Sequence, residues 1–436
     1  MLISFVIVKV SSIQKCLLLT LVYLFASKLL QWGCFVTVFN VTLDVRYVIL
    51  LGEANYYLPT SLTLSFLNNK RAPPMTGETP LVRFENIQKS YDGETLVVKD
   101  FNLDVAPGEF VTMLGPSGSG KTTCLMMLAG FEPATQGEIY LKGKVINNVP
   151  PYKRGIGMVF QNYALFPHMT VAENLAFPLE VRKIPKAERE ERVKKALDMV
   201  QLGAFGGRRP MQLSGGQQQR VAVARSLIFD PDLVLMDEPL GALDKNLREQ
   251  MQYEIKHLHE QLGLTVVYVT HDQTEALTMS NRIAVFEDGI VQQCAAPADL
   301  YEKPQNAFVA NFIGENNRLM GKVTAISGDK VDILSDNGDV LVATKINVHA
   351  VGDRTTVSLR PERVFVNPEP SSVDNLFSAR VEELIYHGDH IRTRFTVCGH
   401  DDFIVKVPNS TANSLLQEGN TVPIGWKMED CLALDA

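Results

Sequence analysis

Residues 115–122 read GPSGSGKT, a glycine-rich loop that ends in a lysine and a threonine. The loop matches the pattern G-x-x-x-x-G-K-[ST] at every fixed position. Glycine lets backbone N–H groups approach phosphate oxygens closely, and the N-terminus of a following helix adds positive dipole charge. Lys121 is then expected to reach the β- and γ-phosphates, and the Thr122 hydroxyl to ligate Mg²⁺. A glycine-serine turn with a solvated lysine is the simpler alternative, but the flanking strand and helix patterns favour a nucleoside triphosphate site.

Two carboxylates stand at the end of a second apolar run, LVLMDEP (233–239). Strand geometry points consecutive side chains to opposite sides, so Asp237 and Glu238 should have different roles. Asp237 is expected to hold Mg²⁺ through water, as in other P-loop proteins. Glu238 is then free to polarise an attacking water. His271 follows a third apolar run, VVYVT, and could hydrogen-bond a γ-phosphate there.

A second sequence suited to an anion, LSGGQ (213–217), comes about a hundred residues after the first. It precedes a helical pattern, so its N–H groups and the helix dipole would favour a negative charge. One phosphate loop suffices for one nucleotide in one fold. The second turn is best explained if it closes over a nucleotide that another copy of the chain holds.

These motifs, in this order, resemble the nucleotide-binding subunits of ATP-binding cassette (ABC) transporters, from about residue 80 to the end of the chain. The other matching features are Gln161 in VFQNYALFP and the sequence GALD at 241–244. The resemblance implies that Tyr91 stacks on adenine, that Gln161 senses Mg²⁺ and links to a membrane partner, and that Asp244 contacts the second subunit. It implies catalytic roles for Glu238 as base and His271 as switch residue, with Gln161 beside them.

The resemblance implies an ATP site made by Tyr91, Gly115, Pro116, Ser117, Gly118, Ser119, Gly120, Lys121, Thr122, Thr123, Ser214, Gly215, Gly216, Gln217 and Asp244. It implies Mg²⁺ ligation by Thr122, Gln161 and Asp237. Ser214 and the two glycines after it would meet the γ-phosphate bound by the opposite subunit. An active ATPase is expected, because no motif position is degraded.

Strand and helix patterns alternate between these motifs. Short apolar runs at 109–114, 232–237 and 264–270 are typical of strands buried on both faces of a parallel sheet. The stretch from about 160 to 230 has helical periodicity. The fold expected for residues 80–315 is therefore an α/β P-loop NTPase cassette with a helical insertion subdomain.

The pattern of apolar and polar residues changes after about residue 316. Short alternating runs such as KVDIL, VLVAT and RTRFTV are separated by Gly, Asp and Asn turns. Residues 316–436 are therefore predicted to form a separate all-β domain, sandwich or small barrel. The domain resembles the OB-like, transport-associated (TOBE) domain of bacterial importers. A dimer-stabilising module and a regulatory sensor are both compatible with it.

The first 74 residues differ from the rest, with six Lys/Arg against two Asp/Glu in a chain of net charge −7. The apolar run at 16–26 is short for a membrane span. A membrane anchor, a signal peptide and an upstream extension are the three interpretations. We favour the extension, with Met75 as the natural start.

Composition argues against other classes of function and site. The acidic net charge and the lack of a basic block argue against a nucleic-acid partner. The six cysteines are scattered without CxxC spacing, which indicates neither a disulfide framework nor a zinc site. His257, His259, His387 and His390 are expected to be surface residues rather than metal ligands.

The resemblance also implies the assembly. A homodimer of the cassette would drive two integral-membrane permease subunits, served indirectly by a periplasmic substrate-binding protein, at the cytoplasmic face of the inner membrane. Residues 155–182 resemble the segment that receives the permease. The sequences around 254–293 and 301–317 look most like spermidine/putrescine import motors, with iron(III), sugar and sulfate importers as alternatives. A soluble ABC ATPase without a transport role is the alternative of another class.

Overall fold

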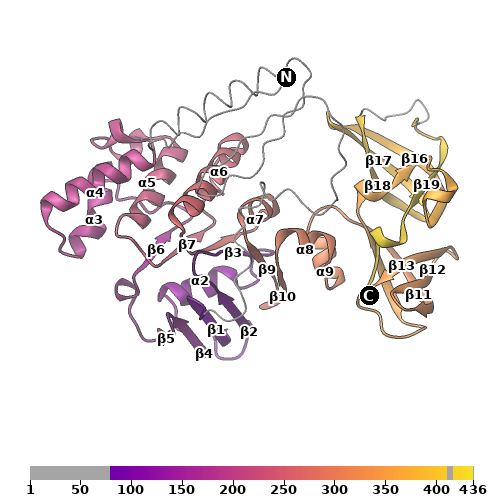
Figure 1. Cartoon of the computed structure of the whole chain (residues 1–436), viewed down its shortest axis with the longest axis horizontal. Coiled ribbons are helices and arrows are strands. Elements are labelled where there is room, and N and C mark those ends of the chain that lie inside the picture. Colours follow the sequence, from indigo (N-terminus) through magenta and orange to yellow (C-terminus); the bar gives the residue numbers. More distant parts are fainter. Residues whose placement is uncertain (1–78, 410–415, 436) are drawn as a thin grey trace, which may run out of the picture. The chain divides into compact units, whose positions relative to one another are not determined.

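The computed structural model describes residues 79–409 and 416–435 (Figure 1). The predicted upstream extension, with Met75, lies outside these residues. No helix in the described ranges is long and apolar enough to cross a membrane. Two regions follow one another along the chain, an α/β cassette and then a domain made of strands.

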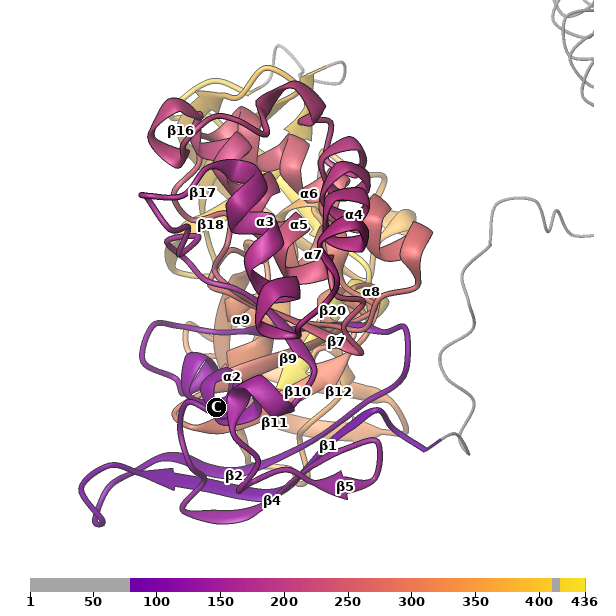
Figure 2. The same cartoon turned by 90° about the vertical axis from the view of Figure 1, so that its left-hand side faces the viewer.

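The cassette is built on a ten-stranded sheet in the order β5-β4-β1-β2-β10-β9-β3-β8-β7-β6. Its strands are β1 (Val82–Ser90), β2 (Leu96–Val105), β3 (Phe110–Leu114), β4 (Gln136–Leu141), β5 (Lys144–Val145), β6 (Ile156–Val159), β7 (Leu233–Asp237), β8 (Val266–Thr270), β9 (Arg282–Glu287) and β10 (Ile290–Ala295). Neighbours from β9 through β3, β8 and β7 to β6 pair in parallel, whereas β1, β2, β4 and β5 form an antiparallel part. Figure 2 shows this antiparallel part gathered at the bottom of the view.

The central strands explain the position of the motifs. Every residue of β3, β7 and β8 is buried, as expected for apolar strands covered on both faces. In the parallel register Leu114 lies opposite Thr270, and Asp237 lies opposite Val269. The carboxyl ends of the three strands therefore meet at one edge of the sheet, where open α/β sheets bind their ligands. This confirms the predicted α/β cassette.

The helices of the cassette are α2 (Lys121–Ala129), α3 (Val171–Val181), α4 (Lys186–Met199), α5 (Gly215–Leu227), α6 (Lys245–Leu262), α7 (Gln273–Met279), α8 (Pro297–Glu302) and α9 (Ala307–Phe312). A separate apolar cluster joins α3, α4 and α5, including Leu175, Leu197 and Val221. These three helices lie together in Figure 1 and form the predicted helical insertion.

The strands after residue 316 form two parts. A closed barrel contains β11 (Asn317–Ser327), β12 (Lys330–Ser335), β13 (Val340–Lys345), β20 (Cys431–Leu434) and β14 (Arg354–Leu359). A five-stranded sheet contains β15 (Phe365–Val366), β19 (Thr421–Trp426), β16 (Asn375–Tyr386), β17 (His390–Val397) and β18 (His400–Pro408). One apolar cluster, with Leu319, Val381 and Trp426, includes residues of both parts. The predicted all-β domain is thus a small barrel joined to an open sheet.

A buried arginine connects this domain to the short helices α8 and α9. Arg360, at the end of β14, donates to the carbonyl oxygens of Ala310 (2.9 Å), Tyr301 (3.0 Å) and Glu315 (3.2 Å). Its guanidinium also lies 4.2 Å from the centroid of the Tyr301 ring. Because an arginine deprived of such partners would leave a buried charge uncompensated, α8, α9 and the first barrel strands are held together.

Candidate functional site

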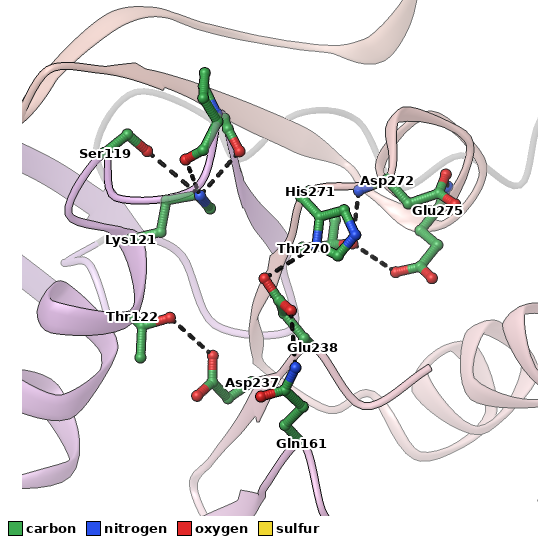
Figure 3. A network of polar contacts seen from close by, with 12 residues as sticks. Ser119, Lys121, Thr122, Gln161, Asp237, Glu238, Thr270, His271, Asp272 and Glu275 are labelled. Carbon is green, nitrogen blue, oxygen red and sulfur yellow. Dashed lines mark hydrogen bonds and ion pairs between the residues drawn. The ribbon is translucent and has the colours of Figure 1, made fainter. Parts of the chain in front are cut away.

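Three strand ends and one loop bring the predicted catalytic side chains together (Figure 3). The loop after β3 leads into α2, whose first two residues are Lys121 and Thr122, β7 ends with Asp237, and His271 directly follows β8. Gln161 comes from the loop after β6. Four neighbouring parallel strands therefore supply one cluster.

The glycine-rich loop has the backbone that its sequence predicts. Gly118 and Gly120 have φ angles of 83° and 100°, which side chains with a Cβ rarely adopt. A Cβ on Gly120 would also lie 2.9 Å from the carbonyl oxygen of Val97. Gly120 is the N-cap of α2, so the first N–H groups of that helix face the loop. This geometry is a cradle for phosphate oxygens.

Lys121 is held by the loop's own oxygen atoms. Its ammonium group donates to the carbonyls of Gly115 (2.9 Å) and Pro116 (2.7 Å) and to the Ser119 hydroxyl (3.3 Å). Burial lowers the pKa of Lys121, whereas the nearby carboxylates of Glu238 and Asp237 raise it. A phosphate at this site would take over these bonds and favour the charged lysine.

Thr122 and Asp237 form the part of the site suited to a divalent cation. The Thr122 hydroxyl donates to Asp237 Oδ1 at 3.1 Å, so two oxygen ligands of the kind that Mg²⁺ prefers are adjacent. Burial raises the pKa of Asp237, and the bond from Thr122 opposes that rise. A cation placed between these oxygens would compensate the buried carboxylate. The residues present therefore fit the predicted metal.

Glu238 accepts from two side chains. Gln161 Nε2 donates to Glu238 Oε2 at 3.2 Å, and His271 Nδ1 lies 3.1 Å from Glu238 Oε1. The Glu238 side chain is 21% exposed and that of His271 is 58% exposed, so a water molecule can reach both. The arrangement suits a carboxylate that orients a nucleophilic water.

The separation of the two carboxylates has a different cause from the predicted one. Strand β7 ends at Asp237, so the alternation of a strand does not extend to Glu238. Glu238 instead has a left-handed backbone with φ of 43°, immediately before Pro239. Non-glycine residues in this region are strained, and such strain is concentrated at functional sites.

The remaining residues of the predicted ATP site come from other segments of the cassette. Tyr91 is 60% exposed in the turn after β1, with the Lys89 ammonium 4.6 Å from its ring centroid. Its ring is thus accessible to a base. Ser117 is exposed at the tip of the glycine-rich loop, and Thr123 is half-buried in the first turn of α2.

Ser214 makes its hydrogen bonds within its own turn. It is the N-cap of α5 and forms a capping box with Gln217, with N–O distances of 3.1 Å and 3.4 Å. In the described part of the chain, no hydrogen bond connects Ser214 to the cluster around Lys121. A Cβ on Gly216 would lie 2.9 Å from Leu247 on α6, so this glycine also has a packing role.

Asp244 is the exposed N-cap of α6, and its side chain accepts from the Leu247 N–H at 3.0 Å. It stands in the loop after β7, seven positions beyond Asp237. The structure therefore leaves this carboxylate in an N-capping geometry at the surface.

Sequence reasoning missed a polar network directly behind His271. Glu275 is buried in α7 and accepts from the hydroxyls of Tyr268 and Thr270, each at 2.7 Å. Arg248 on α6 pairs with Asp272 at 3.1 Å. The available signal was the position of Asp272 and Glu275 in THDQTE, one and four residues after the predicted histidine.

One histidine prediction was wrong. His259 is only 8% exposed, and its ring meets Phe110 edge to face with centroids 5.4 Å apart. It lies on the buried side of α6, where the i, i+4 and i+8 positions Met251, Ile255 and His259 face the sheet. His257 and His387 are exposed, as predicted.

Comparison with known proteins agrees with this geometry. The family profile described as ABC transporter matches residues 98–241, and the TOBE domain profile matches residues 357–434. The spermidine/putrescine import ATP-binding protein of Rubrobacter xylanophilus is 45% identical over 360 residues, covering 82% of this chain and 94% of that protein.

Two further proteins of the same name are similar to this chain. That of Roseobacter denitrificans is 47% identical over 337 residues, covering 77% of this chain and 92% of its own length. That of Thermobifida fusca is 44% identical over 364 residues, covering 81% and 94%. Identity of this degree over most of both sequences, together with the cassette and the β domain, confirms the predicted resemblance. The chain belongs to the ABC transporter family, as an ATP-binding protein with a C-terminal TOBE domain.

Proposed function

We propose that this chain is the ATP-hydrolysing motor of a bacterial polyamine importer. Two copies close over two ATP molecules and drive separate integral-membrane permease subunits from the cytoplasmic face of the inner membrane. The observation that carries the hydrolytic part is the contact of Glu238 with both Gln161 and His271 beside the glycine-rich loop. The similarity to spermidine/putrescine import proteins supports the cargo.

The positions of the residues support the following roles. Lys121 and the N-terminus of α2 bind the β- and γ-phosphates, and Tyr91 stacks on adenine. Thr122, Asp237 and Gln161 would hold Mg²⁺, and the ion would supply charge neutralisation at the phosphate oxygens. Glu238 takes a proton from the attacking water, and His271 hydrogen-bonds the γ-phosphate.

The dimer explains the second anion-binding turn. Ser214, Gly215 and Gly216 of one copy contact the γ-phosphate held by the other, and Asp244 contacts the partner near it. The γ-phosphate then gains donors from both copies only in the closed state, so ATP shifts the population towards closure. Hydrolysis removes those contacts and the dimer reopens.

A groove on the helical insertion is suited to the permease. It has a volume of about 460 Å³ and lies between α3 and α4, with Ala172, Ala176 and Val193 on its apolar side and Arg189 and Glu180 among its charged residues. Helix α3, which lines the groove, follows the segment that carries Gln161 along the chain, so a helix seated there would be connected to the ATP site through that segment. A periplasmic substrate-binding protein delivers the cargo to the permeases.

Asp237→Asn should separate the role of this carboxylate in cation binding from its effect on the stability of the fold. Burial raises the pKa of Asp237, so the folded state favours the neutral form, and the ionised carboxylate at neutral pH lowers stability. This loss of stability is absent below the ordinary pKa of aspartate. It develops as the pH rises from that value through the raised pKa of Asp237 in the folded state. We therefore expect the variant to melt no lower than wild type without Mg²⁺, while Mg²⁺-dependent hydrolysis falls by about 100-fold or more.

Calorimetry and phosphate release measure the two effects. Asp104→Asn, which removes an exposed carboxylate paired with Arg83, is the control and should change neither one. Undiminished Mg²⁺-dependent turnover in Asp237→Asn would remove this carboxylate from the cation site.

Cargo is tested by uptake in cells that depend on this chain. Uptake of labelled spermidine and putrescine should be lost on deletion and restored by the wild-type gene, but not by Lys121→Met. Uptake of iron(III), maltose and sulfate should be unaffected. Loss of one of these instead of polyamine uptake would replace the cargo and leave the motor function intact.

A further inference from the structure

The loop at residues 241–244 and His271 are joined by one side chain that the ATP site itself does not use. The loop precedes α6, and His271 precedes α7. In the proposed dimer the loop faces the partner copy, whereas His271 faces the ATP bound in its own chain. A physical link between the two would connect the two ATP sites.

Arg248 makes that link. It lies one turn into α6, and its backbone N–H bonds to the carbonyl of Asp244. Its guanidinium donates to the carbonyl oxygen of Leu243 at 3.2 Å, inside the loop, and to Asp272 Oδ2 at 3.1 Å, beside His271. The side chains of Arg248 and Asp272 are 31% and 25% exposed, so their ion pair is partly shielded from solvent.

Asp272 connects Arg248 to the backbone on both sides of His271. Its other oxygen, Oδ1, accepts from the N–H groups of Thr274 (2.7 Å) and Glu275 (3.2 Å) and thereby caps α7. Its own N–H donates to the Thr270 hydroxyl at 3.0 Å. The residues before and after His271 are therefore both fixed, and Figure 3 shows this network directly behind the histidine.

The network behind Asp272 is stiff enough to transmit a displacement. Glu275 is 3% exposed and accepts from Tyr268 and Thr270, which anchors α7 to the end of β8. The third donor of Arg248, Nε, is buried without a hydrogen bond and lies 4.0 Å from Glu275 Oε1. A small shift of α6 towards α7 would complete this bond, so the arginine has a second arrangement within reach.

We propose that Arg248 is a positioning residue that couples the 241–244 loop to His271, so that closure around one ATP prepares the other site. The inference rests on the proposed closing dimer. It requires arginine because only a planar guanidinium can contact the loop carbonyl, Asp272 and Glu275 at the same time. Lysine has three donors on one compact ammonium group, so it can keep the ion pair with Asp272 but cannot reproduce the planar, spread-out donors of the guanidinium.

Arg248→Met tests the coupling in the full-length chain, since methionine keeps an unbranched apolar stem but removes every donor. We expect kcat for ATP to fall about tenfold, with KM within about twofold of wild type and the Hill coefficient for ATP reduced towards 1. Arg248→Lys should restore part of both. Asp272→Asn, which can still cap α7, should reproduce the defect, and the double variant should be no worse than either single one.

The matched control is Lys256→Met. Lys256 also connects α6 to α7, through a 2.7 Å bond to the Thr278 carbonyl, but at the far end of both helices from His271. It should leave kcat and the Hill coefficient unchanged. Equal loss in this variant would show that any α6–α7 connection matters, which would overturn a specific role for Arg248.

The remaining outcomes are separable. A cooperative wild type with an Arg248→Met variant of unchanged kcat and Hill coefficient, or one that only melts earlier, would overturn the coupling and leave the dimer standing. A wild type that hydrolyses ATP without cooperativity and shows no ATP-dependent dimer by light scattering would remove the proposed closing dimer, and the coupling with it.

Discussion

Replacing Glu238 with glutamine should lower ATP turnover by about 100- to 10,000-fold while leaving ATP binding intact, the range typical for loss of a general base. Glutamine has nearly the same shape and keeps one acceptor oxygen, so it can still accept from Gln161 Nε2, which now bonds to Glu238 at 3.2 Å. It cannot take a proton from water. The variant should therefore accumulate as an ATP-bound dimer, because the step that reopens it is blocked.

Phosphate release gives the rate, and light scattering with ATP gives the mass of the particle. Glu302→Gln is a suitable control. Glu302, the last residue of α8, is a surface carboxylate paired with Arg363, so its substitution should leave both measurements unchanged. A Glu238→Gln variant that turns over within about twofold of wild type would exclude this residue as the base.

Ser214→Arg should abolish hydrolysis and still allow each monomer to bind ATP. The long cation would fill the turn that, in the proposed dimer, faces the partner's γ-phosphate. Lys121 and Thr122, which in the proposed function bind ATP within the same chain, make no hydrogen bond to Ser214 in the described residues. Dissociation constants for a fluorescent ATP analogue, measured below the dimerisation concentration, should match wild type.

The substitution also removes a helix cap, so a cap control is needed. Ser214 forms a capping box with Gln217, and Thr170 forms one with Glu173 at the start of α3. Loss of either cap should cost on the order of 1 kcal/mol. Thr170→Arg should therefore melt like Ser214→Arg but retain ATPase activity. Equal loss of ATP binding in Ser214→Arg would mean that LSGGQ serves its own chain.

The sequence was most informative where one local pattern determines both backbone and chemistry. GPSGSGKT specifies left-handed glycines before a helix N-terminus, and Gly118 and Gly120 adopt that backbone. The apolar runs before Asp237 and His271 form buried parallel strands because such runs lose solvent contact on both faces. The meeting of the strand ends at one edge follows from that class of sheet.

Contacts between distant segments could not be predicted in the same way. The pairing of Arg248 with Asp272 depends on how α6 and α7 pack, and an isolated arginine on a helix looks like a surface residue. His259 was misassigned because two histidines at i, i+2 were taken together, although they lie on different faces of α6. The left-handed backbone of Glu238 has no sequence signal, because the proline after it favours an extended backbone.

The division of the C-terminal strands into a barrel and a sheet could not be predicted from the sequence either. Strand β20, near the end of the chain, inserts between β13 and β14, each of which ends more than 70 residues earlier in the sequence. Alternating patterns identify strands but not their neighbours, because pairing partners are chosen by packing of the whole domain.

The buried Arg360 determines where this protein can be recombined with its relatives. A graft that exchanges residues 316–436 alone would introduce the relative's arginine directly after β14. That arginine would have to hydrogen-bond the carbonyls of Tyr301 and Ala310 of the host. A junction placed ahead of Pro297 carries α8 and α9 with the barrel and preserves every one of these bonds. The transplantable unit is therefore larger than the strand-rich region, and hybrid motors built with the earlier junction should be the ones that fold.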